Sequence, residues 1–312
     1  NPLALATCLS VNSLFTSNGD AALFVNCGVA IVRNSTFTGT AAAGNPAVAQ
    51  NFGRTLLIHS TVAGNAGRGI GVSTYAYATV VANNAAGDLF SSGIYLSGGS
   101  NLYGTLTGST IRGVTDGNVS NVAAGLAPLG SYGGSTDTLA LLPGSVAING
   151  VVNQPEVQLI VRDETDTASY TLTFNGQTTA PLTSPNEATL QSALEALPSI
   201  GAGNVDVIGT GSGFPIAVAV VQFTGALANT NQPLIVSSRP GVLVRPILDG
   251  GTLTATDQRG ITRAQGAAAD IGAYESRGFN RTLTGGSPQS AAINSAFASP
   301  LSLTVTAAAS GE

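Results

Sequence analysis

A short half-polar phrase recurs along the first part of the chain, and this repetition restricts the fold more than any other feature. The phrase reads VNSLFTSN, RNSTFTGT, HSTVAGN, ANNAAGD and GSTIRGV. Its central apolar residues are separated by 22, 25, 23 and 26 positions, and they are Phe15, Phe37, Val62, Ala85 and Ile111. Periods of about 20 to 30 residues, built from short β-prone runs and Gly/Asn turns, are typical of solenoids, in which each coil covers the apolar face of the next.

A right-handed parallel β-helix of at least five coils is the solenoid that these units fit, over roughly residues 1–125. One coil rises by the strand spacing of about 4.8 Å, so equivalent residues form ladders. Inward positions then favour Val, Ile, Leu, Ala and Phe, while Asn and Ser at the bends bond to the local backbone. No apolar period of about 3.6 residues runs through the units, which argues against helical or Leu-rich repeats.

Charge is scarce throughout the chain, and this limits the classes of function. Only 9% of the 312 residues are charged, while 43% are hydrophobic and 40 are Gly, so we expect an ordered, mostly β protein. The net charge of −5 gives no electrostatic footprint for nucleic acid or an anionic membrane. No apolar run approaches the roughly 20 residues of a transmembrane helix. Because the chain contains no Met, we expect it to be a processed or excerpted part of a longer precursor.

Two segments beyond the repeats resemble a known family. YGGSTDTLALLPGSVAING at 132–150 and TDQRGITRAQGAAADIGAYE at 256–275 are similar to the C-terminal portion of bacterial surface β-helix proteins of the choice-of-anchor Q type. In that family the two pieces form one continuous cap, whereas here about 100 residues separate them, and Asn149 replaces the usual Asp. The resemblance implies an extracellular or cell-surface β-helix whose cap is interrupted by an inserted domain.

The segment between the two cap pieces reads as a small α+β module. It has four β-prone runs and one helix in the order ββαββ, and it resembles modules repeated in tandem in very long bacterial extracellular proteins. The helix is predicted to begin at Ser184 as N-cap, with Pro185 and Glu187 in its first turn. Residues 156–238 carry one Arg and seven acids, so most of the chain's excess negative charge lies there.

The last segment resembles the opening of a bacterial immunoglobulin-like repeat. Within residues 287–308, Leu301, Leu303 and Val305 alternate with Ser and Thr, as is typical of a half-exposed strand. A lone strand is not stable, so we expect this one to pair with the body of the chain or with another molecule. The predicted fold class is therefore all-β, a right-handed parallel β-helix with a small inserted α+β domain and a C-terminal extended strand. We expect four parts: the β-helix with the first half of its cap (1–150), the inserted module (151–245), the second half of the cap (246–280) and the C-terminal linker and strand (281–312).

Few residues offer catalytic chemistry. β-Helix enzymes that cleave polysaccharides need several carboxylates, or a metal held by carboxylates, on one face of neighbouring coils. Residues 1–155 contain four acids, Asp20, Asp88, Asp116 and Asp137. The first three fall at turn positions of the repeat. His59, the only histidine, lies where Asn34 lies one coil earlier. It is either a general base or sugar contact or, as we favour, an outward or bend residue in a polar ladder. We expect no catalytic, cofactor-binding or metal site, and no enzyme activity.

Three further groups have both a functional and a structural interpretation. The acids Asp163, Glu164 and Asp166 are candidates for Ca²⁺, although they lack the spacing of a calcium-binding loop, and a hairpin turn is the alternative. A mixed-charge group in the second cap piece fits a binding site or, as we favour, ion pairs that fasten the cap. Its members are Asp257, Arg259, Arg263, Asp270 and Glu275. Four tyrosines are candidates for a sugar platform: Tyr75, Tyr77, Tyr95 and Tyr103.

Cys8 and Cys27 are the only cysteines. They form either one disulfide or two small buried side chains, and the sequence leaves both open.

Two classes of function fit these residues. The first is a structural subunit or segment of an extracellular bacterial surface protein or fibre, such as a stalk or adhesin body. Its copies would stack head to tail, with the C-terminal strand completing a neighbour's sheet. The second is a carbohydrate-binding or carbohydrate-cleaving β-helix, like a tailspike or a lyase. The expected partners are copies of the same chain, further domains of a longer chain, or cell-surface glycans.

Overall fold

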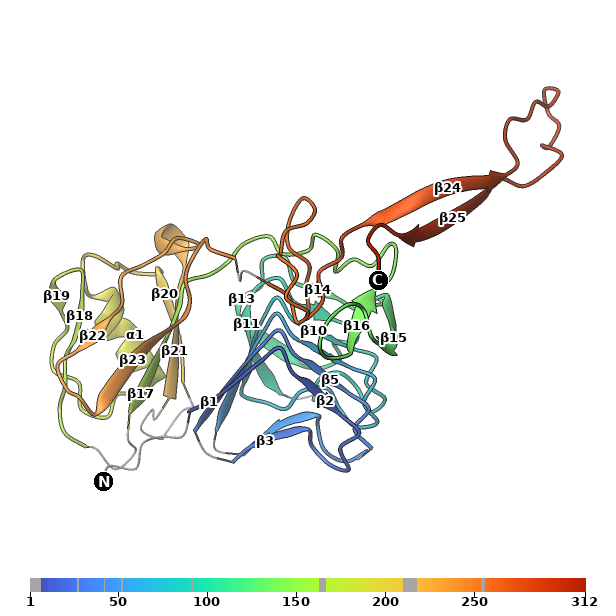
Figure 1. The fold of residues 1–312 in the computed structure, drawn as a ribbon. Coiled ribbons are helices and arrows are strands. Elements are labelled where there is room, and N and C mark those ends of the chain that lie inside the picture. The colour runs from blue at the N-terminus through green and yellow to red at the C-terminus, as the bar shows by residue number, and fades with distance from the viewer. Residues whose placement is uncertain are drawn as a thin grey trace.

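A computed structural model describes residues 7–312, apart from positions 27, 42, 52, 91–92, 163–166, 210–217 and 254–255. Its first part is a β-solenoid of stacked parallel strands, as predicted (Figure 1). Sheet 1 has six strands in the order β1 (Thr7–Val11), β4 (Val29–Arg33), β7 (Arg54–Ile58), β9 (Thr74–Tyr77), β11 (Ile94–Gly98) and β13 (Thr110–Val114). Sheet 2 also has six, from β2 (Leu14–Thr16) through β5 (Thr36–Thr38), β8 (Thr61–Ala63), β10 (Val80–Ala82) and β12 (Leu102–Tyr103) to β14 (Val119–Ser120). Two short parallel strands, β3 (Leu23–Val25) and β6 (Val48–Gln50), begin a third side.

A tight bend joins sheet 1 to sheet 2 in each of the first four coils. Its residues have left-handed backbone angles, with φ of 53° at Asn12, 49° at Asn34, 47° at His59 and 48° at Ala78. Asn tolerates this conformation better than most residues do, which explains its recurrence at the bend. The backbone N–H groups of Asn34 and His59 each donate to the next coil, at 3.0 Å. His59 therefore lies in the bend ladder one coil after Asn34, as predicted.

The ladder of apolar residues inside the solenoid agrees with the repeat for three coils and then departs from it. Phe15 pairs with Phe37 in register, their rings are stacked 4.4 Å apart, and Phe37 pairs with Val62. The next member is Val81, 19 residues on, rather than Ala85.

The repeat alignment at Ala85 and Ile111 was wrong. Ala85 is an exposed turn residue, and Ile111 belongs to β13 in sheet 1, where it pairs with Tyr95. The phrase ANNAAGD is equivalent to the turn that follows β8 in the coil before. The side-chain amide of Asn65 in that turn donates to the amide oxygen of Asn84 at 2.8 Å. In this coil the alignment of the repeats sets a polar turn equivalent to the strand of the coil before it.

Residues 157–248 form an α+β unit. An antiparallel sheet, here sheet 3, has the order β20 (Val205–Ile208), β21 (Val218–Phe223), β17 (Val157–Arg162) and β23 (Val242–Leu248). A smaller sheet contains β18 (Leu172–Phe174), β19 (Gln177–Thr178) and β22 (Val236–Ser237), and a short 3₁₀ turn spans Gly225–Leu227.

Helix α1 (Glu187–Glu195) begins two residues later than predicted. Its N-cap is Asn186, whose side chain accepts a hydrogen bond from the Thr189 N–H at 2.8 Å. Ser184 has a left-handed φ of 44°, which is incompatible with the extended conformation of an N-cap. Its hydroxyl instead accepts a hydrogen bond from Arg162 at 3.1 Å.

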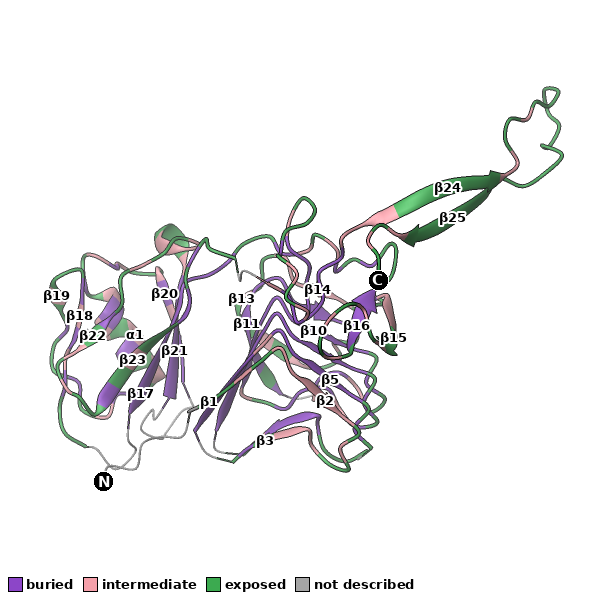
Figure 2. Cartoon of the chain, viewed as in Figure 1, coloured by how far each residue is buried: buried purple, intermediate pink, exposed green. Residues whose placement is uncertain are grey.

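Three apolar layers hold these parts together. One fills the solenoid, a second lies between sheet 1 and sheet 3, and a third lies between sheet 3 and α1. Leu56 and Tyr75 of sheet 1 share the second layer with Leu159 and Val220 of sheet 3. Strands β4, β7, β9 and β11 are mostly buried (Figure 2), so the middle of sheet 1 is covered on both faces, whereas its end strands β1 and β13 are more exposed.

The remaining segments lie beside sheet 2 and beyond it. Strands β15 (Leu126–Gly130) and β16 (Thr138–Leu141) are antiparallel. The chain ends in an antiparallel hairpin of β24 (Phe279–Gly285) and β25 (Ser302–Ala307), which projects away from the body (Figure 1). The C-terminal strand thus pairs with its own chain, through β24. Among the described residues, no helix is long and apolar enough to cross a membrane.

Candidate functional site

The four acids of the solenoid region do not meet. Asp20 accepts a hydrogen bond from Asn45 at 2.6 Å in an exposed turn. Asp88 is buried, and its carboxylate accepts from the Asn84 amide at 2.8 Å and from the Thr105 N–H at 2.7 Å. Asp137 is exposed beside β16, and Asp116 lies in a turn after β13. No group of three metal-ligating side chains occurs within the described part of the chain.

His59 is sealed inside the molecule. Its side chain is fully buried, its ring meets Tyr77 edge-on at 5.3 Å, and neither ring nitrogen has a hydrogen-bond partner among the described residues. Burial lowers the pKa of His59 well below its usual value, and the cations Arg263 and Arg33 lower it further. A neutral, enclosed imidazole has no route to a polysaccharide, so this geometry does not fit a general base for such a substrate.

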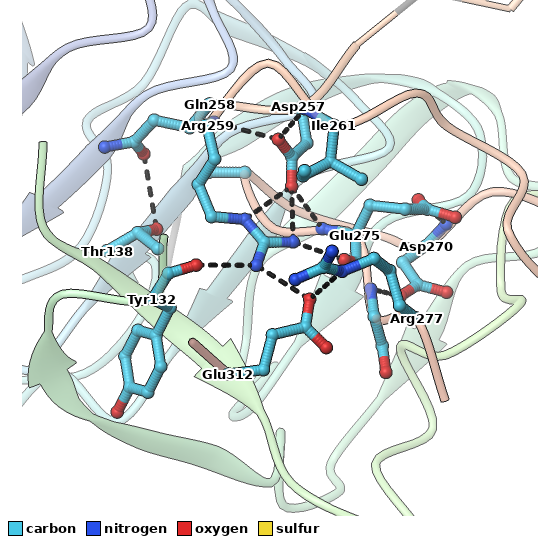
Figure 3. Close-up of polar contacts among 12 residues, drawn as sticks. Tyr132, Thr138, Asp257, Gln258, Arg259, Ile261, Asp270, Glu275, Arg277 and Glu312 are labelled. Carbon is cyan, nitrogen blue, oxygen red and sulfur yellow. Dashed lines mark hydrogen bonds and ion pairs between the residues drawn. The ribbon is translucent and has the colours of Figure 1, made fainter. Parts of the chain in front are cut away.

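The mixed-charge group of the second cap piece does come together, and Figure 3 shows its contacts. Arg259 lies 2.8 Å from Asp257 and 2.8 Å from Glu312, and its guanidinium lies 3.7 Å from the centre of the Tyr274 ring. Arg259 also donates to the Tyr132 carbonyl at 2.9 Å. The side chains of Arg259 and Asp257 have no exposed surface, so this ion pair belongs to the interior.

The carboxylates of this group also fix the local backbone. Asp257 accepts from the N–H groups of Arg259 at 2.8 Å, Ile261 at 3.0 Å and Glu275 at 3.0 Å. Glu275 accepts from the Asp270 N–H at 2.8 Å. These bonds hold residues 257–275 as an ordered loop without helix or strand.

Three contacts attach this loop to the bends of the solenoid. Arg263 donates to the side chain of Asn34 at 3.0 Å, the Ala273 N–H donates to the Thr61 hydroxyl at 3.0 Å, and the Gly272 N–H donates to the Ala78 carbonyl at 2.8 Å. The loop therefore covers the bend ladder along its side.

Burial dominates the electrostatics of the loop. It raises the pKa of Asp270 to about 7, with a further contribution from Glu275, and it raises the pKa of Glu275. Burial lowers the pKa of Arg263, although three neighbouring carboxylates oppose the shift. For Arg259, the contacts with Asp257 and Glu312 outweigh burial and raise the pKa. The group has no exposed face for a ligand, and its geometry fits the predicted role of fastening the cap.

Sequence reasoning missed several members of this network. Glu312, whose side chain is 3% exposed, joins it through Arg259 and through Arg277 at 2.9 Å. Thr36 of β5 donates to the side chain of Gln258 at 2.6 Å, and Thr138 lies 2.9 Å from Thr36. These partners are at least 35 positions apart in the chain, so no local sequence pattern predicts the contacts.

The other candidates do not form sites. All four tyrosines are buried, so they offer no exposed platform for a sugar. Tyr75 and Tyr77 face the layer between sheets 1 and 3, while Tyr95 and Tyr103 fill the solenoid. The three Ca²⁺ candidates, Asp163, Glu164 and Asp166, lie outside the described residues. Cys8 is exposed in β1, and Cys27 also lies outside the described residues, so the disulfide stays open.

Two small cavities lie where the α+β unit meets the solenoid. One, of about 110 Å³, has Gly98, Asp116 and Gln222 in its wall, and the other, of about 200 Å³, has Arg33, Gln154 and Asp249. Ligand pockets usually measure about 300 to 1,000 Å³. Neither cavity has the size of a pocket for an oligosaccharide.

Stacked coils, left-handed bends and interior ladders define the first part of the chain as a parallel β-helix. A family model for the right handed beta helix region matches residues 6–131. No curated protein matches the chain significantly. Proteins with this fold include lyases and hydrolases as well as proteins without catalytic activity, so the fold alone leaves the function open.

Proposed function

We propose that this protein is a structural module of an extracellular bacterial surface protein or fibre, and that its copies assemble head to tail by β-strand addition. The observation that carries the proposal is the hairpin of β24 and β25. An isolated two-stranded hairpin is marginal in water, and an unpaired strand edge is a template for another chain. Here both strands are almost entirely exposed, so the hairpin gains stability when it adds to another sheet.

The hairpin has one apolar face and one polar face. Leu283 lies directly opposite Leu303, and Val305 lies opposite Arg281, whereas Thr282 and Thr304 face the other side. Leu303 is 53% exposed and Leu283 49%. Amphipathic strands normally bury their apolar face against a second layer, and none of the described segments covers this one.

The base of the hairpin is held firmly. The Ala308 N–H donates to the Gly278 carbonyl at 2.9 Å, and Glu312 is bonded to both Arg259 and Arg277. The arm therefore leaves the body at a fixed point and presents its free edges to solvent. A fixed arm loses less entropy on docking than a loose tail does.

A carbohydrate-binding or carbohydrate-cleaving function has less support than the structural one. The acids of the β-helix are separated, the only histidine is buried, and the tyrosines are internal. Localisation outside the cell rests on the resemblance to bacterial surface proteins and on the low charge of the chain. A glycan-binding or glycan-cleaving role is the result to look for if assembly fails.

Sedimentation velocity over a concentration series tests the proposal. Wild-type protein is expected to form a ladder of oligomers, and Leu303→Asp with Val305→Asp is expected to abolish it. Val236→Asp, at a 58% exposed position of β22, is the matched control and is expected to assemble normally. A single monomeric species at every concentration, together with saturable binding or cleavage in a glycan screen, would replace this proposal by the second one.

A further inference from the structure

The apolar layer between sheets 1 and 3 is open at one side. Leu9 of β1 pairs in register with Ile31, a buried member of this layer. Leu9 itself is 64% exposed, and Val11, which alternation places on the same face, is 44% exposed. The first strand of sheet 1 thus carries apolar residues of the layer without the cover that β4, β7 and β9 have.

The edge of sheet 3 explains this opening. Arg33, at the end of β4, donates to the carbonyl oxygen of Ile247 in β23, which fixes the edge strand of sheet 3 over β4, one strand in from β1. Leu243 of β23 lies opposite the buried Val161, yet it is 46% exposed. Leu9 and Val11 of β1 and Leu243 of β23 are thus exposed apolar residues on strands that border this layer, and together they are here called the open edge.

Two unpaired strands border the open edge. In the described structure, β1 pairs with β4 alone and β23 pairs with β17 alone. The N–H and C=O groups on the outer side of β1 have no ladder partner among the described strands, which invites strand addition.

We propose that the open edge is the acceptor for strand β25 of a second copy of this chain. β25 pairs with β1, and its Leu303 and Val305 face Leu9, Val11 and Leu243 of the neighbour. This inference rests on the proposed function and names the surface that the hairpin binds. The contact joins two different surfaces, so it repeats without closing.

The donor is β25 and not β24, because of charge. β24 carries Arg281 in its middle, and a charged side chain on an edge strand opposes pairing. β25 reads SLTVTA, without charge or Pro, and its β-branched residues favour a strand.

The open edge continues the apolar layer between sheets 1 and 3, and this favours a second copy of the chain as the molecule that binds it. The open edge continues a layer that Ile31, Leu56 and Tyr75 build with sheet 3 in every molecule. The amphipathic strand that fits it is on the same chain and lacks any cover of its own. In the combined sheet, β25 of one copy lies beside β1 of the other copy, and β1 lies beside β4. The apolar residues of β25 then extend the row that Leu9 and Ile31 form across β1 and β4.

The proposed register gives a sharp test, because period-2 alternation assigns each side chain to a face. When Leu303 and Val305 face the layer, Ser302, Thr304 and Thr306 lie on the face of Cys8. Cys8 is exposed in β1 and serves as a natural reporter. A disulfide requires Cα atoms about 4.4 to 6.8 Å apart, so only a residue beside Cys8 will cross-link.

The experiment uses the full chain with Cys27→Ala, to which Ser302→Cys, Thr304→Cys or Thr306→Cys is added singly. Mild oxidation is expected to give a ladder of covalent oligomers on a non-reducing gel for at least one of the three. Thr282→Cys, on the same face of the hairpin but in β24, is the control and is expected to give at least tenfold less. If all three match the control in material that sedimentation shows to be assembled, the open edge is not the acceptor, although assembly itself stands.

A second measurement tests whether the open edge is the acceptor if the cysteine variants fail to fold. Leu243→Asp should weaken assembly of the otherwise unchanged chain at least tenfold, while Val236→Asp should leave it unchanged. Equal assembly by both variants would show that the open edge is not the acceptor for β25. Absence of assembly in the wild-type chain overturns this inference and the proposed function together.

Discussion

Single residues at the bend of the solenoid show how the two halves of the chain depend on each other. Asn34 and His59 occupy equivalent bend positions, and Arg263 of the loop 257–275 donates to Asn34 and lowers the pKa of His59. The sequence predicts the place of His59 in the ladder from its spacing to Asn34. It does not predict that the ring is buried, because the covering residues lie about 200 positions further along the chain.

His59→Asn is expected to reduce the loss of stability in acid. The folded pKa of His59 lies below its unfolded value of about 6.5. Its contribution is therefore fully present above pH 6.5 and is lost as the pH falls, because the unfolded chain takes up the proton. Between pH 7.5 and 5.5 this loss is on the order of 1 kcal/mol. Asn suits the left-handed bend, as at Asn34.

Thermal and urea unfolding of both proteins at pH 7.5 and 5.5 checks this prediction. The wild type should lose on the order of 1 kcal/mol more stability than the variant over that interval. Carboxyls such as Asp270, whose pKa is raised, act in the opposite direction but equally in both proteins, so they cancel in the comparison. Parallel pH profiles for the two proteins would show that His59 is protonated freely in the folded state.

Arg259→Lys is expected to lower the free energy of unfolding by about 2 to 4 kcal/mol. Arg259 donates to Asp257, Tyr132, Glu275 and Glu312 from one planar group, and a Lys ammonium cannot reach all of these acceptors. Urea denaturation measures the change. Arg245→Lys, at an exposed position of β23, is the control and should change stability by no more than about 0.5 kcal/mol; equal effects at both positions would contradict the network's role.

At the scale of elements, sequence periodicity located the strands of three coils and then lost register. Phe15, Phe37 and Val62 are equivalent, as their spacing predicts. Shortening of the fourth coil to 19 residues, between Val62 and Val81, moves a polar turn into the place where the repeat expects a strand. Turn motifs and strand motifs share Asn, Ser and Gly here, so composition alone cannot separate them.

A pair of substitutions tests the corrected register. Val81→Asp places a charge in the closed interior of the solenoid and is expected to cost at least about 3 kcal/mol. Ala85→Asp lies in an exposed turn and should change stability by no more than about 0.5 kcal/mol. Chemical denaturation of both variants gives the comparison, and a greater loss at Ala85 would restore the alignment by repeats.

At the scale of the molecule, the chain combines a closed body with two uncovered strand regions. Sheet 1 is covered on both faces in its middle strands but not at its end strands β1 and β13, and the hairpin of β24 and β25 is exposed. The alternation of Leu303 and Val305 predicted a strand that needs a partner. The sequence does not reveal that β24 supplies that partner, or that Glu312 anchors the arm, because both depend on the folded cap.

Negative-stain electron microscopy of the purified chain at high concentration is the most direct test of the central claim that copies join through these two regions. The account predicts filaments or short chains of particles for the wild type, and single particles for Leu303→Asp with Val305→Asp. Wild-type fields containing only isolated particles would contradict it.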